Sequence, residues 1–246
     1  DEVLVEIVAE KKRFVRAELV ENARPSPDRV EPVCPLFAPG GCGGCQWQHV
    51  AMERQQAAKH DIVVRALAAR VERVHPLRTP VPDYGWRRRA RLGWQQDEHG
   101  GVRLGFAKER THEIVAVNDC AQLVPALAGV LAPLGGWLAD MEGVGPKGEA
   151  RLLCGVDGDV HVSVRARRAA TWARAAESLL GQANIAGVLF SDGKHDPVVV
   201  GKAAIVLDRA AGASARGPAS PGRDASVNDR AEGGAEFWQS ADAFAQ

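Results

Sequence analysis

The first twenty residues contain two short runs that are rich in apolar side chains. Residues 3–8 and 13–20 carry apolar side chains at every second position, and the basic residues Lys11 and Lys12 lie between the runs. This alternation predicts two strands joined by a tight turn. Because two strands alone cannot enclose a core, we expect the hairpin to be part of a small barrel whose beginning is missing.

The pattern changes after the hairpin. Pro25, Pro27 and Pro32 are typical of a linker. Residues 50–70 are rich in alanine and in long polar side chains, which favours one long helix. Between the linker and the helix lies a segment dominated by cysteine, glycine and proline.

Strand patterning returns at residues 86–94. Arg87, Arg89 and Arg91 fall on one face of the predicted strand. The opposite face carries Trp86, Ala90, Leu92 and Trp94, with Arg88 as its one charged member. Further strands are predicted at 102–106, 113–117, 152–156, 160–164, 185–190, 198–200 and 204–207, with helices at 122–140 and 171–180. Asp157-Gly158 predicts a hairpin turn between two of these strands. Residues 208–236 have the composition of a flexible linker.

Composition narrows the classes of function. The 31 basic residues balance the 31 acidic ones, so a nucleic-acid partner has to be argued from local patches. Apolar runs are too short to span a membrane and no secretory leader opens the chain, so we expect a cytoplasmic monomer without a membrane partner. Both ends lie within patterned segments, so we also expect the chain to be a piece of a longer protein.

Four of the five cysteines carry the candidate chemistry. Cys34, Cys42 and Cys45 lie within twelve residues, separated by glycine and proline, and Cys120 follows far downstream. A 4Fe-4S cluster requires four thiolates, which these four residues can supply. A zinc site that uses His49 instead of Cys120 is the first alternative, and cysteines without a metal are the second. Cys154 lies in an apolar strand and is predicted to be a core residue.

Several motifs point in order to one family. They are Pro25-Ser26-Pro27-Asp28-Arg29-Val30, Cys34-Pro35, Cys42-Gly43-Gly44-Cys45, Gln46-Trp47-Gln48-His49, Leu104-Gly105-Phe106, Ile114-Val115 before Cys120, and Phe237-Trp238-Gln239-Ser240. Together they resemble the RNA (uracil-C5) methyltransferases, which form 5-methyluridine in ribosomal or transfer RNA. The similarity extends, in the same order, over essentially the whole chain.

The resemblance implies an architecture and a set of site residues. An N-terminal TRAM domain of OB-fold type binds RNA in that family, a central domain carries the cluster, and a Rossmann-like domain binds S-adenosylmethionine. Cys34, Cys42, Cys45 and Cys120 would be the cluster ligands, and Gln239 would contact S-adenosylmethionine. The catalytic cysteine and carboxylate of the family are expected beyond Gln246, so this chain alone is expected to be inactive.

The RNA-binding residues are predicted from charge. Alternating Arg87, Arg89 and Arg91 beside tryptophans suit phosphate contacts and base stacking, and Lys11 and Lys12 form a second candidate. An ordinary solvated face of a sheet gives the same pattern. The resemblance favours RNA, and ribosomal over transfer RNA.

The prediction is therefore an α+β fold in four parts. They are a partial TRAM domain and linker at 1–32, the iron–sulfur loop and long helix at 33–84, a central antiparallel α+β domain at 85–207, and a linker with the start of a missing Rossmann-like domain at 208–246. The predicted function is that of the RNA-binding, cluster-bearing portion of an S-adenosylmethionine-dependent methyltransferase. The alternative is a stand-alone RNA-binding iron–sulfur or zinc module without catalysis.

Overall fold

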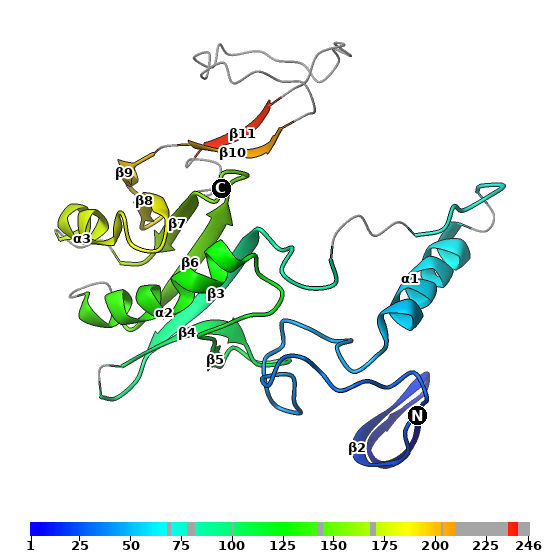
Figure 1. Ribbon diagram of the computed structural model, residues 1–246. Helices are drawn as coiled ribbons and strands as arrows, with labels where there is room; N and C mark the ends of the chain where they lie inside the picture. Colours follow the sequence, from blue (N-terminus) through cyan, green and yellow to red (C-terminus); the bar gives the residue numbers. More distant parts are fainter. Residues whose placement is uncertain are drawn as a thin grey trace. The chain divides into compact units, whose positions relative to one another are not determined.

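The computed structural model divides the chain into two compact units, Asp1–Asp83 and Tyr84–Gln246, here named the N-terminal unit and the C-terminal unit (Figure 1). The structure describes residues 1–67, 70–77, 82–99, 101–141, 145–167, 171–202, 204–209 and 236–240. None of the helices in these ranges is long and apolar enough to cross a membrane.

The N-terminal unit contains the predicted hairpin and helix. Strands β1 (Glu2–Lys11) and β2 (Phe14–Arg24) pair antiparallel and are longer than the apolar alternation indicated. Both faces of the hairpin are exposed, and apolar side chains such as Ile7 and Leu19 are more than half accessible. Helix α1 (Met52–Leu67) confirms the predicted helix, and Gln55 is its one buried residue.

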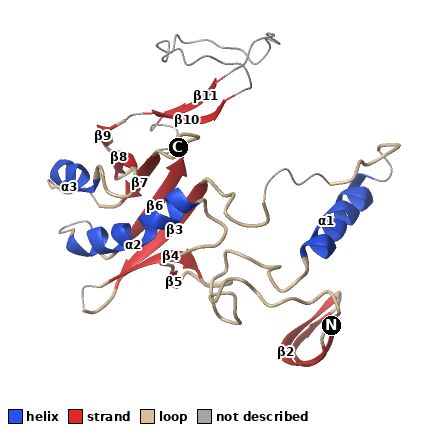
Figure 2. Ribbon diagram, viewed as in Figure 1, coloured by secondary structure: helices blue, strands red, loops and turns tan. Residues whose placement is uncertain are grey.

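The C-terminal unit is built on a seven-stranded sheet in the order β5-β4-β3-β6-β7-β8-β9 (Figure 2). Its strands are β3 (Arg89–Gln96), β4 (Val102–Ala107), β5 (Ile114–Ala116), β6 (Lys147–Cys154), β7 (Val160–Arg165), β8 (Ile185–Ser191) and β9 (Val198–Gly201). All neighbouring strands are antiparallel except β7 and β8. The predicted antiparallel sheet is thus mixed, because a helical crossover rather than a hairpin joins β7 to β8.

Two helices cover one face of this sheet. Helix α2 (Pro125–Asp140) packs on β4 and β6, and helix α3 (Trp172–Leu179) packs on β8 and β9 (Figure 1). Trp137 of α2 donates from Nε1 to the backbone oxygen of Ala175 in α3 at 3.0 Å, so the two helices lie side by side. Phe190 of β8 is fully buried beneath them and stacks on Trp172.

In the described part of the C-terminal unit, α2 and α3 pack on one face of the sheet and no helix of this unit covers the opposite face. The buried side of the strands carries residues such as Leu92, Ala150, Leu152, Val162 and Val164, whose pairing places them in register. Strand periodicity then puts the alternate residues on the other side. We call that side the open face.

Strands β10 (Ala204–Arg209) and β11 (Glu236–Ser240) form a separate two-stranded sheet. The sequence predicted a strand at 204–207 but none at 236–240. Most of the predicted linker at 208–236 lies outside the described residues.

Candidate metal loop and nucleic-acid interface

The segment 34–45, here named the cysteine loop, is organised by successive turns. The amide of Phe37 donates to the backbone oxygen of Cys34 at 3.0 Å, and the amide of Cys42 donates to that of Leu36 at 3.0 Å. A Cβ atom on Gly41 would lie 2.3 Å from the Leu36 oxygen. Glycine at 41 therefore permits the close return of the chain that brings Cys42 back over residue 36.

Two glutamine side chains attach the loop to the helix that follows. Gln48 is buried, and its Oε1 accepts the amide of Cys34 at 3.1 Å. Gln55 of α1 donates from Nε2 to the backbone oxygens of Trp47 and Val50, at 3.0 and 2.9 Å. Buried amide side chains with satisfied hydrogen bonds fix the loop against α1 without an apolar core.

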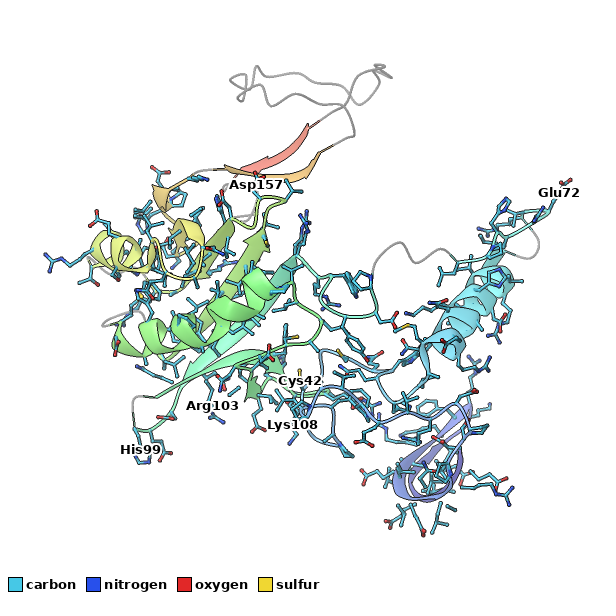
Figure 3. The ribbon with its side chains drawn as sticks, viewed as in Figure 1. Cys42, Glu72, His99, Arg103, Lys108 and Asp157 are labelled. Atoms are coloured by element: carbon cyan, nitrogen blue, oxygen red, sulfur yellow. The ribbon has the colours of Figure 1, made fainter. Side chains whose placement is uncertain are left out.

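The thiols of the loop have the chemistry of cluster ligands. Cys34, Cys42 and Cys45 are half-buried, and the amide of Gly44 donates to Sγ of Cys42 at 3.4 Å (Cys42 is labelled in Figure 3). Thiolates with amide donors directed at sulfur fit an iron–sulfur cluster. Within the described ranges, no three His, Cys, Asp or Glu side chains lie close enough together to hold a metal ion.

His49, the alternative zinc ligand, is engaged with an aromatic ring. Its imidazole stacks on Phe37, with ring centroids 5.6 Å apart. Burial lowers the pKa of His49, and the positive charge of Arg29 lowers it further. The ring is therefore neutral at pH 7, as a metal ligand must be, but a zinc site here would require the stacked ring to move.

Cys120 and Cys154 belong to the C-terminal unit. Cys120 lies in the turn after β5 and is half-buried. The neighbouring Ala121 accepts the amide of Gly85 at 2.8 Å, so this turn is held beside the start of the unit. Cys154 is 3% exposed at the end of β6, and burial raises its pKa. This confirms the predicted core role of Cys154.

Three other predicted residues lie on hairpin strands or turns. Lys11 ends β1 opposite Phe14, Lys12 lies in the turn, and both are exposed. Gln239 lies on β11, where its backbone pairs with Ile205 of β10.

The predicted arginine strand is present, but it begins three residues later than expected, at Arg89. Arg89 and Arg91 are exposed on the open face, and Ala90, Leu92 and Trp94 are buried on the other. Arg87 lies before β3, half-buried, with its guanidinium over the ring of Trp86.

Trp86 was predicted on the same strand face as Ala90, Leu92 and Trp94, but it lies before β3 and is 42% exposed. The amide of Arg87 donates to the oxygen of Gln122, and its own oxygen accepts the amide of Val124. This bridge to residues 121–124 takes Trp86 and Arg87 out of the sheet pairing.

Four further basic residues on the open face were not predicted as binding residues. Strand register places Arg151 directly opposite Arg91, and Arg103 opposite Gln95 (Arg103 is labelled in Figure 3). Lys147 and Arg165 share this face. The alternation Lys147, Glu149, Arg151 with apolar residues between them could have revealed the charged face of β6 from sequence.

One carboxylate lies among these cations. Oε2 of Glu149 accepts a hydrogen bond from Nε of Arg91 at 2.5 Å, and Oε1 accepts one from Nε of Arg151 at 2.6 Å. Partial burial would raise the pKa of Glu149, but the hydrogen bonds from Arg151 and Arg91 outweigh it and hold the pKa below its usual value. Glu149 is therefore ionised at neutral pH.

Comparison with known proteins finds relatives for part of the chain. No family model matches the chain. It is 37% identical over 166 residues to the 23S rRNA (uracil(1939)-C(5))-methyltransferase RlmD of Photorhabdus laumondii, covering 66% of this chain and 37% of that protein. This similarity supports the RNA (uracil-C5) methyltransferase family for the matched part of the chain.

Further members of the family give the same match. The RlmD protein of Halomonas elongata is 36% identical over 160 residues, which cover 64% of this chain and 32% of that protein. The RlmD protein of Cronobacter sakazakii is 35% identical over 145 residues, which cover 58% of this chain and 32% of that protein. The chain thus spans about a third of the length of these relatives.

Proposed function

We propose that this chain is the RNA-recognition and cluster-bearing portion of an S-adenosylmethionine-dependent RNA (uracil-C5) methyltransferase that forms 5-methyluridine in ribosomal RNA. The observation that carries the proposal is the 37% identity over 166 residues with a protein named for that reaction on 23S rRNA. The exposed arginines of the open face support an RNA partner independently of the match.

Cys34, Cys42, Cys45 and Cys120 are proposed to hold a 4Fe-4S cluster. The cysteine loop offers three half-buried thiols and an amide directed at one sulfur, and Cys120 completes the four thiolates that such clusters require. The bound cluster would supply folding energy rather than chemistry on the RNA, because metal–thiolate bonds order chain segments that have little core of their own.

The RNA surface is proposed to include Arg89 and Arg91, with Arg87 beside them and Lys11 and Lys12 on the hairpin. Arg87, stacked on the exposed Trp86, offers a guanidinium and an aromatic face of the kind that unpaired bases stack on. Gln239 is proposed to contact S-adenosylmethionine. Cys154 is not proposed as a nucleophile, since burial raises its pKa and disfavours the thiolate.

Anaerobic purification followed by iron and sulfide analysis tests the cluster. We expect a brown protein with about four irons and four sulfides per chain. Cys120→Ser should remove the iron, whereas His49→Ala should leave it, because a cluster with four cysteine ligands does not use the imidazole. A colourless protein that contains zinc, loses it in the His49 variant and keeps it in the Cys120 variant would contradict the proposal.

Binding to RNA transcripts tests the partner. The chain should bind a fragment of 23S rRNA more tightly than a transfer RNA transcript at the same salt concentration. The double variant Arg89→Ala, Arg91→Ala should weaken binding about 10-fold or more, since each phosphate contact contributes to affinity. Equal binding of the variant and the parent protein would remove the open face from the RNA surface.

A further inference from the structure

The part of the open face formed by β3, β4 and the adjoining parts of β6 and β7 is strongly basic with one acidic residue in its centre, whereas Leu153, His161 and Leu189 on the same face are buried. Among the described residues of the seven strands, Glu149 is the one that carries a carboxylate. The basic residues that register places on the same face are Arg89, Arg91, Arg103, Lys147, Arg151 and Arg165.

The position of Glu149 is set by three strands. Glu149 belongs to β6, two residues before Arg151, and is paired with Arg165 of the neighbouring strand β7. On its other side it is paired with Gly93 of β3, and its side chain accepts a hydrogen bond from Arg91 of the same strand. Each of its two oxygens accepts one guanidinium Nε. An anion held by two arginines in this way has the arrangement that arginine pairs adopt around a phosphate.

Exposure shows which part of the cluster RNA can reach. The Arg91 side chain is 72% exposed, whereas those of Glu149 and Arg151 are 20% and 24% exposed. The accessible guanidinium of Arg91 is thus held by a recessed carboxylate. A ligand phosphate that approaches Arg91 meets the negative charge of Glu149 directly behind it.

We propose that Glu149 is an internal competitor for the RNA backbone: its carboxylate binds the guanidinium of Arg91, the exposed position at which an RNA phosphate binds. This inference rests on the proposed RNA-binding function. Glu149 thereby lowers the affinity of the face for any RNA that does not bring a phosphate to that position, and so contributes to specificity. It acts through the two arginines and is a positioning residue.

The competing explanation is purely structural. Arg91 and Arg151 are directly opposite each other on neighbouring strands, and like charges in that relation destabilise a sheet. Glu149 would then serve only as their counter-ion. The two explanations differ in RNA affinity, because a counter-ion needed only for folding predicts no tighter binding once Glu149 is replaced.

Glu149→Gln tests the inference in the whole chain, with fluorescence anisotropy of a labelled mixed-sequence RNA hairpin as the readout. The variant keeps the size of the side chain and removes its charge. We expect about 3- to 10-fold tighter binding at low salt, and a plot of log affinity against log salt that is steeper by about one. Thermal unfolding of each variant shows whether binding is measured on folded protein, and Glu149→Ser serves if the glutamine variant does not fold.

The matched control is Glu177→Gln. Glu177 is an exposed residue of α3, which covers the other face of the sheet, and its loss changes the net charge by the same amount. Affinity should not change in this variant. Equal tightening by both glutamine variants would show an effect of total charge and overturn the inference.

A double-mutant cycle with Arg91→Gln separates the remaining outcomes. In that background, Glu149→Gln should change RNA affinity less than about twofold, because the competition acts through Arg91. If Arg91→Gln weakens RNA binding but Glu149→Gln alone leaves it unchanged, the inference fails and the proposed function stands. If no arginine variant of the open face affects RNA binding, the proposed RNA surface itself fails. Poly-glutamate that binds as tightly as RNA would show that the face takes acidic protein.

Discussion

Among the individual residues, His161 links the stability of the sheet to pH. Its side chain is buried on β7, and no described residue accepts or donates a hydrogen bond at Nε2. Burial lowers the pKa of His161, although Asp159 raises it and Lys202 lowers it further. The folded state therefore binds a proton less readily than the unfolded chain does.

The sign of the pH effect follows from that difference. Since the folded pKa lies below 6.5, the unfolded state takes up more protons as the pH falls through 6.5. The stability present above pH 6.5 should be lost progressively as the pH falls from there through the folded pKa. Urea unfolding between pH 7.5 and 5 should show this loss in the parent protein and a smaller one in His161→Leu.

His99→Leu is the control for that experiment, because His99 is exposed in the loop between β3 and β4 (Figure 3). It should keep the pH dependence of the parent protein. If His161→Leu and the parent lose the same stability on acidification, another group is responsible for the loss.

Residue-level prediction from sequence succeeded where the signal is local. Arg89 and Arg91 alternate with buried neighbours on one strand, so their exposure could be predicted from periodicity alone. The hydrogen bond from Arg91 to Glu149 could not be predicted in this way. It joins residues that are 58 apart in the sequence, and their pairing depends on the strand order of the sheet. The same limit applies to Arg87, which is displaced by its bridge to Leu123.

At the level of elements, local patterning predicted most helices and strands but not the pairing of β7 with β8. The hairpin turn at Asp157-Gly158 was correctly predicted between β6 and β7. The parallel direction of β8 follows from α3, which returns the chain across the sheet before β8 begins. No property of the strand residues distinguishes that pairing from an antiparallel one.

The backbone of β5 lies so close to Gly105 of β4 that a larger residue does not fit there. A Cβ atom on Gly105 of β4 would lie 1.9 Å from the backbone oxygen of Val115 in β5. Gly105→Ala should therefore force the two strands apart and lower the free energy of unfolding by about 1–3 kcal/mol, as overpacked core substitutions do. Urea unfolding at pH 7.5 measures the change.

Gly129→Ala is the matched control on α2. A Cβ atom there has no neighbour within 4 Å, and glycine in a helix interior is less favourable than alanine. This variant should gain about 0.5–1 kcal/mol. A loss of stability in Gly105→Ala together with a gain in Gly129→Ala would assign the loss to the contact between β4 and β5. A Gly105→Ala protein as stable as the parent would contradict the prediction.

The whole molecule has an uneven distribution of buried apolar surface. The buried hydrophobic residues run from Ala90 to Phe190 and so belong to the C-terminal unit. In the described part of the N-terminal unit, the buried residues are the polar Gln48 and Gln55. Hydrophobic burial therefore stabilises the C-terminal unit far more than the N-terminal one.

This asymmetry predicts how removal of the proposed cluster affects each unit. Because the cysteine loop is attached by amide hydrogen bonds rather than by a core, metal–thiolate bonds should contribute most of its stability. Hydrogen exchange followed by mass spectrometry should show fast exchange of residues 33–51 in protein stripped of iron by chelation and slow exchange in protein prepared anaerobically. Amides of β3, β6, β7 and β8 should exchange equally slowly in both.

Cys45→Ser should match the stripped protein in the loop, while Cys154→Ser, at a core position outside the proposed ligand set, should not. Slow exchange of the loop in metal-free protein would show that the amide hydrogen bonds suffice, and the proposed architectural role of the cluster would then be lost.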